Sequence, residues 1–333
     1  MKKYIYISIF LFAAIAFATS CDNEWTEPKT IDVDQPEVGS DAYFANLRDY
    51  KQSDHQIAFG WFGGWTAAGP SMVTRLYSIP DSVDMIGLWG NMWHRDKMTP
   101  EKTDDLRLTR EVKGMKILVT TLLGWTGKEL PNIPEENWGT DRQEGLRKYA
   151  KALAEEIIDL GFDGLDIDYE PNVGGQTDVR DCPRGEDMIV FVQELGKYLG
   201  PKSNSGKLLV VDGELDALPE ETGPYFDYAI AQAYSTTSSS NLQNRYNRIS
   251  SIFKPEQFIV TEDFEAHWRT GGVNYTETNG NKVPSILGMA KWNPVQGVKG
   301  GCGTYHMEYE YRNTEMEYKY LRQAIQIMNP GVK

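Results

Sequence analysis

The segment Asp163–Glu170 carries the acidic residues best placed for chemistry, in the pattern Asp-Gly-Leu-Asp-Ile-Asp-Tyr-Glu. In an extended strand alternate residues share a face, so Asp166, Asp168 and Glu170 point one way and the apolar residues between them point the other. Carboxyls packed this closely cannot all ionise cheaply, so we expect shared protons and at least one raised pKa. A raised pKa is what a general acid needs. The alternative interpretation of these acidic residues is an edge strand whose charges face water.

A second polar pair lies in the stretch Ala231-Gln232-Ala233-Tyr234-Ser235. In a strand, Gln232 and Tyr234 share one face and the small alanines lie on the other, beneath a covering helix. Each polar residue could instead be structural, Gln232 as a satisfied core amide and Tyr234 as a packing residue at a barrel mouth. Gln232 and Tyr234 are therefore candidate residues of the site.

The remaining sequence predicts the scaffold that positions these residues. Short apolar or β-branched runs alternate with helical patterns, which indicates parallel βα units. Eight runs are expected as strands: Ile57–Phe62, Val83–Trp89, Met115–Leu122, Gly164–Tyr169, Leu208–Val211, Tyr228–Tyr234, Phe258–Thr261 and Gly303–Met307. Eight strands without a glycine-rich phosphate loop favour a single closed (β/α)8 TIM barrel over a doubly wound open sheet.

Helical spacing of apolar residues is clearest over Arg142–Leu160 and Glu186–Leu199. Arg245–Phe253 and Glu315–Met328 are expected as later helices, whereas the pattern around 218–225 is weak. In a barrel, the apolar face of the acidic strand would contact helices, and its carboxyls would lie inside with Glu170 at the C-terminal rim. Active sites of such barrels lie at that rim, so Glu170 is the candidate acid catalyst.

Aromatic residues cluster after the first three predicted strands, at Trp61, Phe62, Trp65, Trp89, Trp93 and Trp125. Sugar C–H faces stack on such rings, and the number at one end of the barrel favours a saccharide cleft, with Trp61, Trp89 and Trp125 as candidate substrate contacts. Each ring taken singly is more often a core or rim packing residue. Asn91 and the pair Glu262-Asp263 are weaker polar candidates for the same cleft.

The acidic segment resembles the signature of family-18 glycoside hydrolases, the chitinases and endo-β-N-acetylglucosaminidases, because all four acidic positions of Asp-x-x-Asp-x-Asp-x-Glu are present from Asp163 to Glu170. The resemblance extends along the barrel. In that family the sixth strand of the endo-β-N-acetylglucosaminidases carries Gln-x-Tyr, like Gln232 and Tyr234 here, whereas chitinases usually carry Met-x-Tyr-Asp. The pattern is therefore closer to the endo-β-N-acetylglucosaminidases.

This resemblance implies retaining hydrolysis assisted by the substrate, without an enzyme nucleophile. Glu170 would protonate the glycosidic oxygen while the 2-acetamido carbonyl of the sugar attacks the anomeric carbon, and Glu170 would then activate water. Asp168 would hold the acetamido N–H, with Asp166 sharing a proton behind it. Tyr234 and Gln232 would fix the acetamido carbonyl, so the cleaved position must carry GlcNAc.

Other positions depart from the family pattern or from the acidic face. Asp163 has the opposite strand parity and is expected to brace the start of its strand. Chitinases usually show Ser-x-Gly-Gly on the third strand and a tryptophan on the eighth, whereas the corresponding stretches here are Thr120–Gly124 and Thr304–Glu308. Long chitin chains are therefore less favoured. Either Tyr305 or His306 could form the subsite floor, and Tyr305 is kept among the candidate substrate contacts.

The N-terminus has the features of a bacterial lipoprotein signal. Its apolar run is shorter than the ~20 residues of a membrane-spanning helix, and Ala18-Thr19-Ser20-Cys21 resembles a lipobox. We expect residues 1–20 to be removed, Cys21 to be acylated, 21–41 to form a tether, and 42–333 to form the hydrolase domain. An ordinary signal peptide is the alternative.

Export to the outer membrane is the expectation that follows from this signal. Asp22-Asn23-Glu24 resembles an acidic surface-export signal, so exposure at the cell surface is expected. The leaflet stays open, because Asp directly after the acylated cysteine elsewhere retains lipoproteins in the inner membrane.

The net charge of the chain, its cysteines and its histidines limit which partners, disulfides and metals are expected. Loss of Lys2 and Lys3 takes the formal charge from −14 to −16, and no Lys/Arg cluster is present, so nucleic acid is not an expected partner. Cys182 and Cys302 could form one disulfide or stay separate. The four histidines show no metal-ligand spacing, so no metal is expected. No cofactor is expected either. The protein is expected to be a monomer.

Three functions are compatible with these patterns. The leading one is an endo-β-N-acetylglucosaminidase that cleaves the GlcNAc-β-1,4-GlcNAc core of N-linked glycans. A chitinase or chito-oligosaccharide hydrolase is second, and a non-catalytic glycan-binding lipoprotein on the same barrel is third. Fold alone cannot choose between them, but a barrel that had lost its activity would typically have lost the acid, and Glu170 is present.

Overall fold

The computed structural model describes residues 37–123, 130, 139–172 and 182–331. The chain divides into two compact units, Met1–Tyr43 and Phe44–Lys333. The helix α2 (Asp41–Gln52) begins in the first unit and ends in the second, which holds all the other elements discussed below. Over the described ranges, no helix has both the length and the apolar character needed to cross a membrane.

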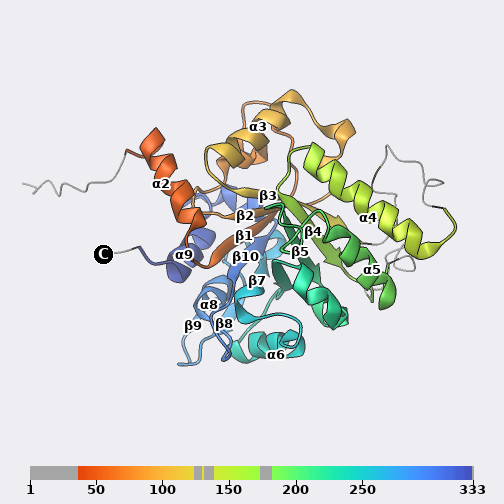
Figure 1. The fold of residues 1–333 in the computed structure, drawn as a ribbon. Helices are drawn as coiled ribbons and strands as arrows, with labels where there is room; N and C mark the ends of the chain where they lie inside the picture. The colour runs from red at the N-terminus through yellow and green to blue at the C-terminus, as the bar shows by residue number, and fades with distance from the viewer. Residues whose placement is uncertain (1–36, 124–129, 131–138, 173–181, 332–333) are drawn as a thin grey trace, which may run out of the picture. The chain divides into compact units, whose positions relative to one another are not determined.

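In the described part of the second unit, eight parallel strands close into a barrel (Figure 1). Around the barrel they are β1 (Ile57–Phe62), β10 (Gly301–Tyr305), β7 (Phe258–Asp263), β6 (Tyr228–Gln232), β5 (Leu208–Gly213), β4 (Gly164–Tyr169), β3 (Lys116–Leu122) and β2 (Met85–Leu88). The ring closes because β1 pairs with β10 on one side and with β2 on the other. The predicted (β/α)8 barrel is confirmed, and the doubly wound open sheet is excluded.

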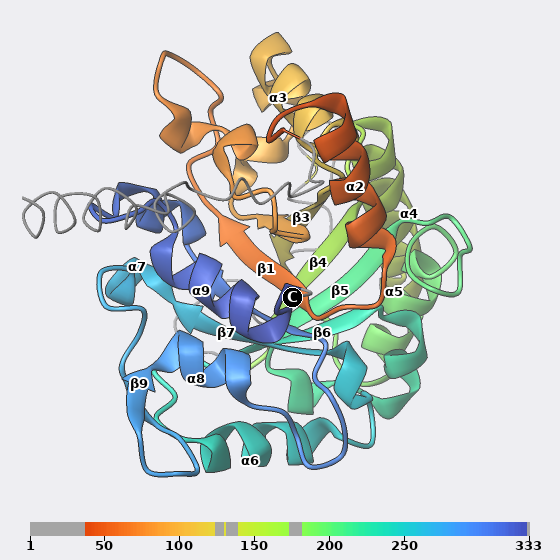
Figure 2. The same ribbon diagram turned by 90° about the vertical axis from the view of Figure 1, so that its left-hand side faces the viewer.

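Helices cover the outside of the barrel, as Figures 1 and 2 show. The α-helices after the first barrel strand are α3 (Pro100–Glu111), α4 (Arg142–Asp159), α5 (Glu186–Leu195), α6 (Ser239–Ile249), α7 (Phe264–His267), α8 (Ser285–Lys291) and α9 (Lys319–Met328). After β5, where the helical pattern of the sequence is weak, the chain forms two 3-10 helices, η8 (Leu215–Ala217) and η9 (Glu220–Tyr225). A short antiparallel pair, β8 (Asn274–Thr276) and β9 (Lys282–Pro284), precedes α8.

Further 3-10 helices lie in the connections: η2 (Met72–Thr74), η3 (Leu76–Ser78), η4 (Asn91–Trp93), η5 (Arg95–Lys97), η10 (Pro255–Gln257) and η11 (Met307–Arg312). The first two follow β1, and the next two follow β2. These connections therefore supply irregular backbone at the ends of the strands, where side chains can be directed towards a site.

The helix α4 shows how the sequence pattern becomes packing. The Asp141 side chain accepts a hydrogen bond from the backbone N–H of Glu144 at 2.8 Å, which caps the first turn. Apolar residues at helical spacing, including Leu146, Leu153 and Ile157, are buried in the outer core between the helices and the strands. The helix ends one residue before the predicted boundary.

Several boundaries differ from the predictions. The strand β5 continues to Gly213 and so includes Asp212. The strand β10 lies two residues earlier than predicted and includes two glycines. A Cβ at Gly301 would lie 2.1 Å from the Ile57 carbonyl oxygen, so close approach to β1 requires glycine there and conceals the strand in the sequence.

Two predicted helices also have different ends. The helix α5 ends at Leu195, four residues before the predicted end, and Gly196 follows it. The helix α6 begins at Ser239, six residues before the predicted start, and the Ser238 side chain accepts a hydrogen bond from the Asn241 backbone N–H. The pattern of apolar residues located both helices, but side-chain caps and glycines set where they end.

The barrel wall separates two apolar layers. The outer faces of the strands contribute Leu165 and Ile167 to the large cluster beneath the helices. A smaller cluster fills the inside of the barrel, made of Phe59, Trp61, Met85, Leu118, Val210, Ile230 and Ile259. At Gly87 a Cβ would lie 2.7 Å from Cδ1 of Trp61, so this glycine leaves room for the indole. The strand alternation that buries Leu165 outside therefore directs Asp166 and Asp168 inside.

Candidate active site

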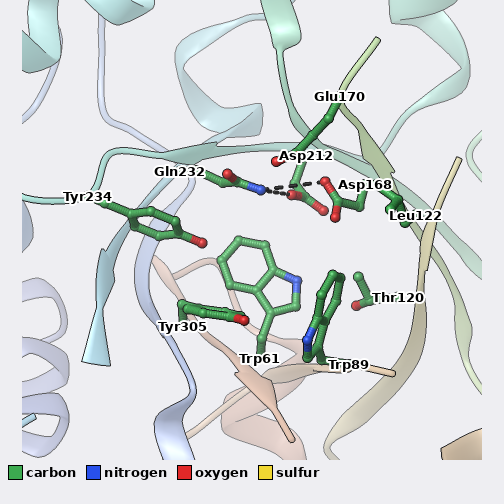
Figure 3. Close-up of a pocket in the computed structure, with 10 residues that line it drawn as sticks. All are labelled: Trp61, Trp89, Thr120, Leu122, Asp168, Glu170, Asp212, Gln232, Tyr234 and Tyr305. Atoms are coloured by element: carbon green, nitrogen blue, oxygen red, sulfur yellow. Dashed lines mark hydrogen bonds between the residues drawn. The ribbon is translucent and has the colours of Figure 1, made fainter. Parts of the chain in front are cut away.

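A pocket opens at the C-terminal ends of the barrel strands (Figure 3). The residues that line it are Trp61, Trp89, Thr120, Leu122, Asp168, Glu170, Asp212, Gln232, Tyr234 and Tyr305. Its volume of about 280 Å³ is at the lower end for small-molecule sites, so it suits one sugar ring better than several. Seven of the predicted site residues therefore meet in one pocket.

Asp166 is fully buried inside the barrel and does not line the pocket. Its Oδ2 accepts hydrogen bonds from the Trp61 indole N–H at 2.8 Å and from the Thr120 hydroxyl at 2.9 Å. Burial raises the pKa of Asp166 to about 6, although both donors act in the opposite direction. Asp166 can therefore influence a ligand only through its neighbours.

Asp168 and Asp212 are cross-strand partners on β4 and β5, and both side chains point into the pocket (Figure 3). The Gln232 amide donates to Oδ1 of Asp212 at 2.8 Å and lies 3.5 Å from Oδ1 of Asp168. Burial, followed by the charges of neighbouring carboxyls, raises the pKa of both aspartates well above the ordinary value. The prediction of raised pKa values within the acidic group is confirmed, and they belong to its buried members.

Glu170 directly follows β4 and is only partly buried, so it is the accessible carboxyl of the group. Figure 3 shows Glu170 at the end of its strand, beside the pocket that Asp168 also lines. The charge of Glu170 contributes to the raised pKa of Asp168. A carboxyl that a substrate can reach thus lies next to a second carboxyl that is almost completely buried.

Two tyrosines form the opposite wall of the pocket. The rings of Tyr234 and Tyr305 are stacked, with centroids 5.8 Å apart, and the ring of Tyr305 also meets Trp61 and Trp89 edge-on, each at 6.2 Å. Burial raises the pKa of Tyr305 to about 12 and, with the charge of Asp212, raises the pKa of Tyr234 further. Both phenols therefore keep their protons at neutral pH and can donate hydrogen bonds.

The structure decides between the two candidates of the eighth strand. Tyr305 is the last residue of β10 and lines the pocket. His306 has a left-handed φ of 50°, and its Nδ1 lies 2.7 Å from Oε1 of Glu308. The change of backbone direction at His306 therefore leaves Tyr305 as the aromatic contact from this strand.

The aromatic candidates divide into two groups. Trp61 is only 2% exposed, so its ring is the floor of the pocket and not an open stacking platform, while Trp89 is partly exposed at the wall. Phe62, Trp65 and Trp93 belong to the outer core and do not line the pocket. Trp125 lies outside the described residues.

Asn91 lies in a second pocket beside the first. This pocket has a volume of about 310 Å³ and is lined by Trp89, Gly90, Asn91, Trp93, His94, Thr120, Thr121 and Leu122. Three of these residues, Trp89, Thr120 and Leu122, also line the first pocket, so the two cavities share a wall. Asn91 is therefore next to the predicted site and not inside it.

The expectation that Glu262 and Asp263 belong to the cleft is wrong. The Glu262 side chain is buried and accepts hydrogen bonds from the Ser235 backbone N–H, at 2.7 Å, and from the Ser285 hydroxyl. Asp263 caps α7 by accepting from the Ala266 backbone N–H. Both carboxyls are thus used to hold local structure outside the pocket.

Asp163 lies at the opposite end of β4 from Glu170. Its carboxylate accepts two hydrogen bonds from Arg110, at 2.6 and 2.8 Å, and one from the Ile117 backbone N–H at 3.0 Å. These contacts join the start of β4 to α3 and β3. They match the bracing role that its strand parity predicts.

Cys182 and Cys302 are both buried and carry free thiols, so they do not form a disulfide with each other. Within the described ranges, no group of three or more histidine, cysteine, aspartate and glutamate side chains is arranged to hold a metal ion.

Asp212 is the site residue that the sequence analysis missed. The predicted strand stopped at Val211, two residues before β5 ends at Gly213. Because Val210 points into the barrel, strand alternation places Asp212 inside as well, opposite Asp168. The inward and outward alternation of residues 208–211, continued by one residue, could have revealed Asp212.

The pocket is suited to acid catalysis on a sugar. It has room for one ring, its walls are aromatic, and an accessible carboxyl lies at the rim of the closed barrel. Acid catalysis on a sugar is the chemistry of barrel glycoside hydrolases. Comparison with known families identifies the family to which the chain belongs. The chain belongs to glycoside hydrolase family 18, and the BT1044-like model of that family matches residues 19–327.

Similar proteins include endo-β-N-acetylglucosaminidases. The chain is 27% identical over 319 residues to endo-β-N-acetylglucosaminidase F2 of Elizabethkingia meningoseptica. The aligned region covers 86% of this chain and 85% of that protein. It superimposes on a solved structure of a BT1044 variant with a TM-score of 0.76 and 33% identity, covering 86% and 92% of the two chains. A mutant endo-β-N-acetylglucosaminidase of Cordyceps militaris, in complex with fucosyl-N-acetylglucosamine-Asn, gives a TM-score of 0.66 and 25% identity, covering 89% and 98%.

Proposed function

We propose that this glycoside hydrolase is a retaining endo-β-N-acetylglucosaminidase that cleaves the GlcNAc-β-1,4-GlcNAc core of N-linked glycans. The observation that carries the proposal is the grouping of Glu170, Asp168, Gln232 and Tyr234 around a pocket the size of one sugar ring. The similar endo-β-N-acetylglucosaminidases support it.

Acid catalysis would fall to Glu170, because it is the accessible carboxyl at the rim. It would protonate the glycosidic oxygen as the bond to the anomeric carbon breaks, and it would later take a proton from the attacking water. Asp168 is 3% exposed, so it is better placed to accept a hydrogen bond from an acetamido N–H than to attack carbon.

The acetamido group of the substrate would supply the nucleophile. Its carbonyl oxygen would attack the anomeric carbon and form an oxazolinium ion, which water then opens with overall retention. Gln232 and Tyr234 present N–H and O–H donors to the same pocket and would orient that carbonyl. Correct orientation matters because an intramolecular attack has a very high effective molarity.

The proposal is tested with the full-length protein and its Glu170→Gln variant. N-glycosylated proteins and chito-oligosaccharides are incubated with each, and the products are identified by mass spectrometry. We expect the wild type to leave one GlcNAc on asparagine and the variant to lose about 10²–10⁴-fold in rate, because glutamine cannot transfer the proton.

Glu221→Gln is the matched control, because Glu221 is an exposed carboxyl on η9, away from the pocket. This control is expected to cleave like the wild type. Shortening of chito-oligosaccharides alone would replace the proposal with a chitinase, and binding of glycans without cleavage would replace it with a glycan-binding protein. Normal activity of Glu170→Gln would remove Glu170 from the role of acid.

A further inference from the structure

Asp212 lines the pocket but takes no part in the proposed proton transfer or in binding the acetamido group. It is 1% exposed and is paired in register with Asp168 on β4 and with Ile230 on β6. One of its carboxyl oxygens, Oδ1, accepts the short hydrogen bond from the Gln232 amide (Figure 3). Asp212 therefore links the acetamido-binding amide on one side to the acidic strand on the other.

Over the part of the chain that the structure describes, the groups around Asp212 offer no positive charge. From β4 it faces Asp166, Asp168 and, at the rim, Glu170, and the chain beyond β6 adds Tyr234. No lysine, arginine or histidine is present among the residues that line the pocket. Full ionisation of the aspartates would therefore place several negative charges in a buried space without compensation.

Two carboxyl oxygens in this group have no N–H or O–H donor among the described residues. They are Oδ1 of Asp166 and Oδ2 of Asp212, and both are buried. The carboxyls of Asp212 and Asp166 lie within hydrogen-bonding reach of each other, as do those of Asp212 and Asp168. Because two carboxylates cannot bond without a hydrogen between them, one partner must be protonated.

The donors present indicate which carboxyl keeps the proton. Asp166 accepts two hydrogen bonds on its Oδ2, from Trp61 and Thr120, and these stabilise its charged form. Asp212 has one such donor, Gln232, and Asp168 has the same amide at 3.5 Å, to which a bound substrate would add its acetamido N–H. With substrate bound, Asp212 is therefore the aspartate with the fewest N–H and O–H donors to stabilise a negative charge.

We propose that Asp212 is a positioning residue that stays protonated during the reaction and donates its proton to the neighbouring aspartates. Its other oxygen would at the same time fix Gln232. With Asp212 neutral, negative charge can stay on Asp168 while positive charge develops on the sugar ring. This inference rests on the proposed endo-β-N-acetylglucosaminidase mechanism.

The first test compares Asp212→Asn with Asp212→Val. Asparagine reproduces a protonated aspartate, since it offers one acceptor to Gln232 and one donor to the acidic strand, so we expect kcat/KM to fall no more than about tenfold. Valine has a similar shape but neither group, so we expect a loss of about 10²-fold or more. Asp227→Asn is the matched control, because Asp227 bonds to the Leu209 backbone N–H near the start of the strands and away from the pocket.

Thermal unfolding of each variant separates this role from simple loss of fold. The expected result is that Asp212→Asn and Asp212→Val both retain a cooperative transition although their activities differ. Equal impairment of the two folded variants would overturn the proposal, because it would show that the negative charge of Asp212 is needed. Normal activity of Asp212→Val would overturn it as well.

The second test detects the proton directly and requires no substrate. In the infrared difference spectrum between the wild type and Asp212→Asn at neutral pH, we expect the C=O band of a protonated carboxyl to disappear in the variant. A difference confined to carboxylate bands would refute the proposal. Because this readout is independent of turnover, its failure can be told apart from failure of the proposed enzymatic function.

The pH profile of kcat/KM gives a third, independent readout. If Asp212 is neutral, the Asn variant changes no charge, and its profile should coincide with that of the wild type. If Asp212 is ionised, the variant removes a negative charge beside Asp168 and Glu170, which would move the limbs to lower pH by about one unit. Such a shift would contradict the proposal.

Discussion

Trp61 has two tasks in the active site. Its ring fills the inside of the barrel, where it meets Phe59 edge-on, and forms the floor of the pocket. Its indole N–H donates to Oδ2 of Asp166 and thereby favours the ionised form of that carboxyl. The residue expected from sequence to stack on sugar therefore also stabilises negative charge on Asp166, against the effect of burial.

Trp61→Phe separates the two tasks, because phenylalanine keeps an aromatic ring but has no N–H donor. A hydrogen bond to a charged group contributes about 1.5–3 kcal/mol, so we expect kcat/KM to fall by roughly 10- to 100-fold if that bond supports the reacting state. Steady-state kinetics on a glycopeptide measures the change, and the unfolding midpoint shows whether the core tolerates it. Activity equal to that of the wild type in a stable variant would show that the bond has no catalytic role.

At the scale of elements, the connection after β2 and the end of β3 form a second cavity beside the first. The 3-10 helix η4 begins with the exposed Asn91, and the end of β3 contributes Thr121, whose buried hydroxyl has no partner among the described residues. Among the described residues that line this cavity, none is charged if His94, whose pKa is lowered by burial, is neutral. These features suit a neutral sugar ring adjoining the one that is cleaved.

Asn91→Ala tests whether the second cavity contacts the glycan. We expect KM to rise about three- to tenfold for a branched N-glycan, because a polar contact is lost. The KM for a substrate with only the two core GlcNAc residues should not change, since such a substrate is too short to enter both cavities. Kinetics on the two substrates in parallel provides the comparison, and equal effects on both would place Asn91 outside a glycan subsite.

At the scale of the whole molecule, the chain combines a hydrolase domain with a predicted lipid anchor. The formal charge of −16 that remains after the loss of Lys2 and Lys3 disfavours contact with anionic membrane surfaces, so attachment would depend on the acylated Cys21. We propose that the tether after Cys21 holds the domain at the outer membrane, with the pocket available to glycans outside the cell.

The anchor is tested by Cys21→Ala in a Gram-negative host supplied with labelled fatty acid. We expect the wild type to incorporate label and to fractionate with membranes, and the variant to do neither, because alanine has no thiol to acylate. Immunoblotting of the fractions measures the distribution. Unlabelled wild-type protein in the soluble fraction would indicate an ordinary signal peptide.

The sequence by itself determined the barrel and the acidic face of the site. Strand alternation is a local property of the chain, so it assigned Asp166 and Asp168 to one side of β4 before any contact was known. The same period of two directed Gln232 into the site, whereas the predicted strand over Tyr234 was too long: β6 ends at Gln232, and Tyr234 reaches the pocket from the turn that follows. The spacing of apolar residues in turn located helices such as α4 to within a residue or two.

The tertiary structure decided what depends on neighbouring strands and on the ends of elements. Asp212 joined the site because β5 continues far enough to pair with Asp168, and Tyr305 rather than His306 lines the pocket because the backbone turns after β10. Glu262 left the candidate site because donors from Ser235 and Ser285 hold it elsewhere. Register and hydrogen-bond partners arise between distant segments, so local alternation could direct Asp212 inward but could not show that it lies opposite Asp168.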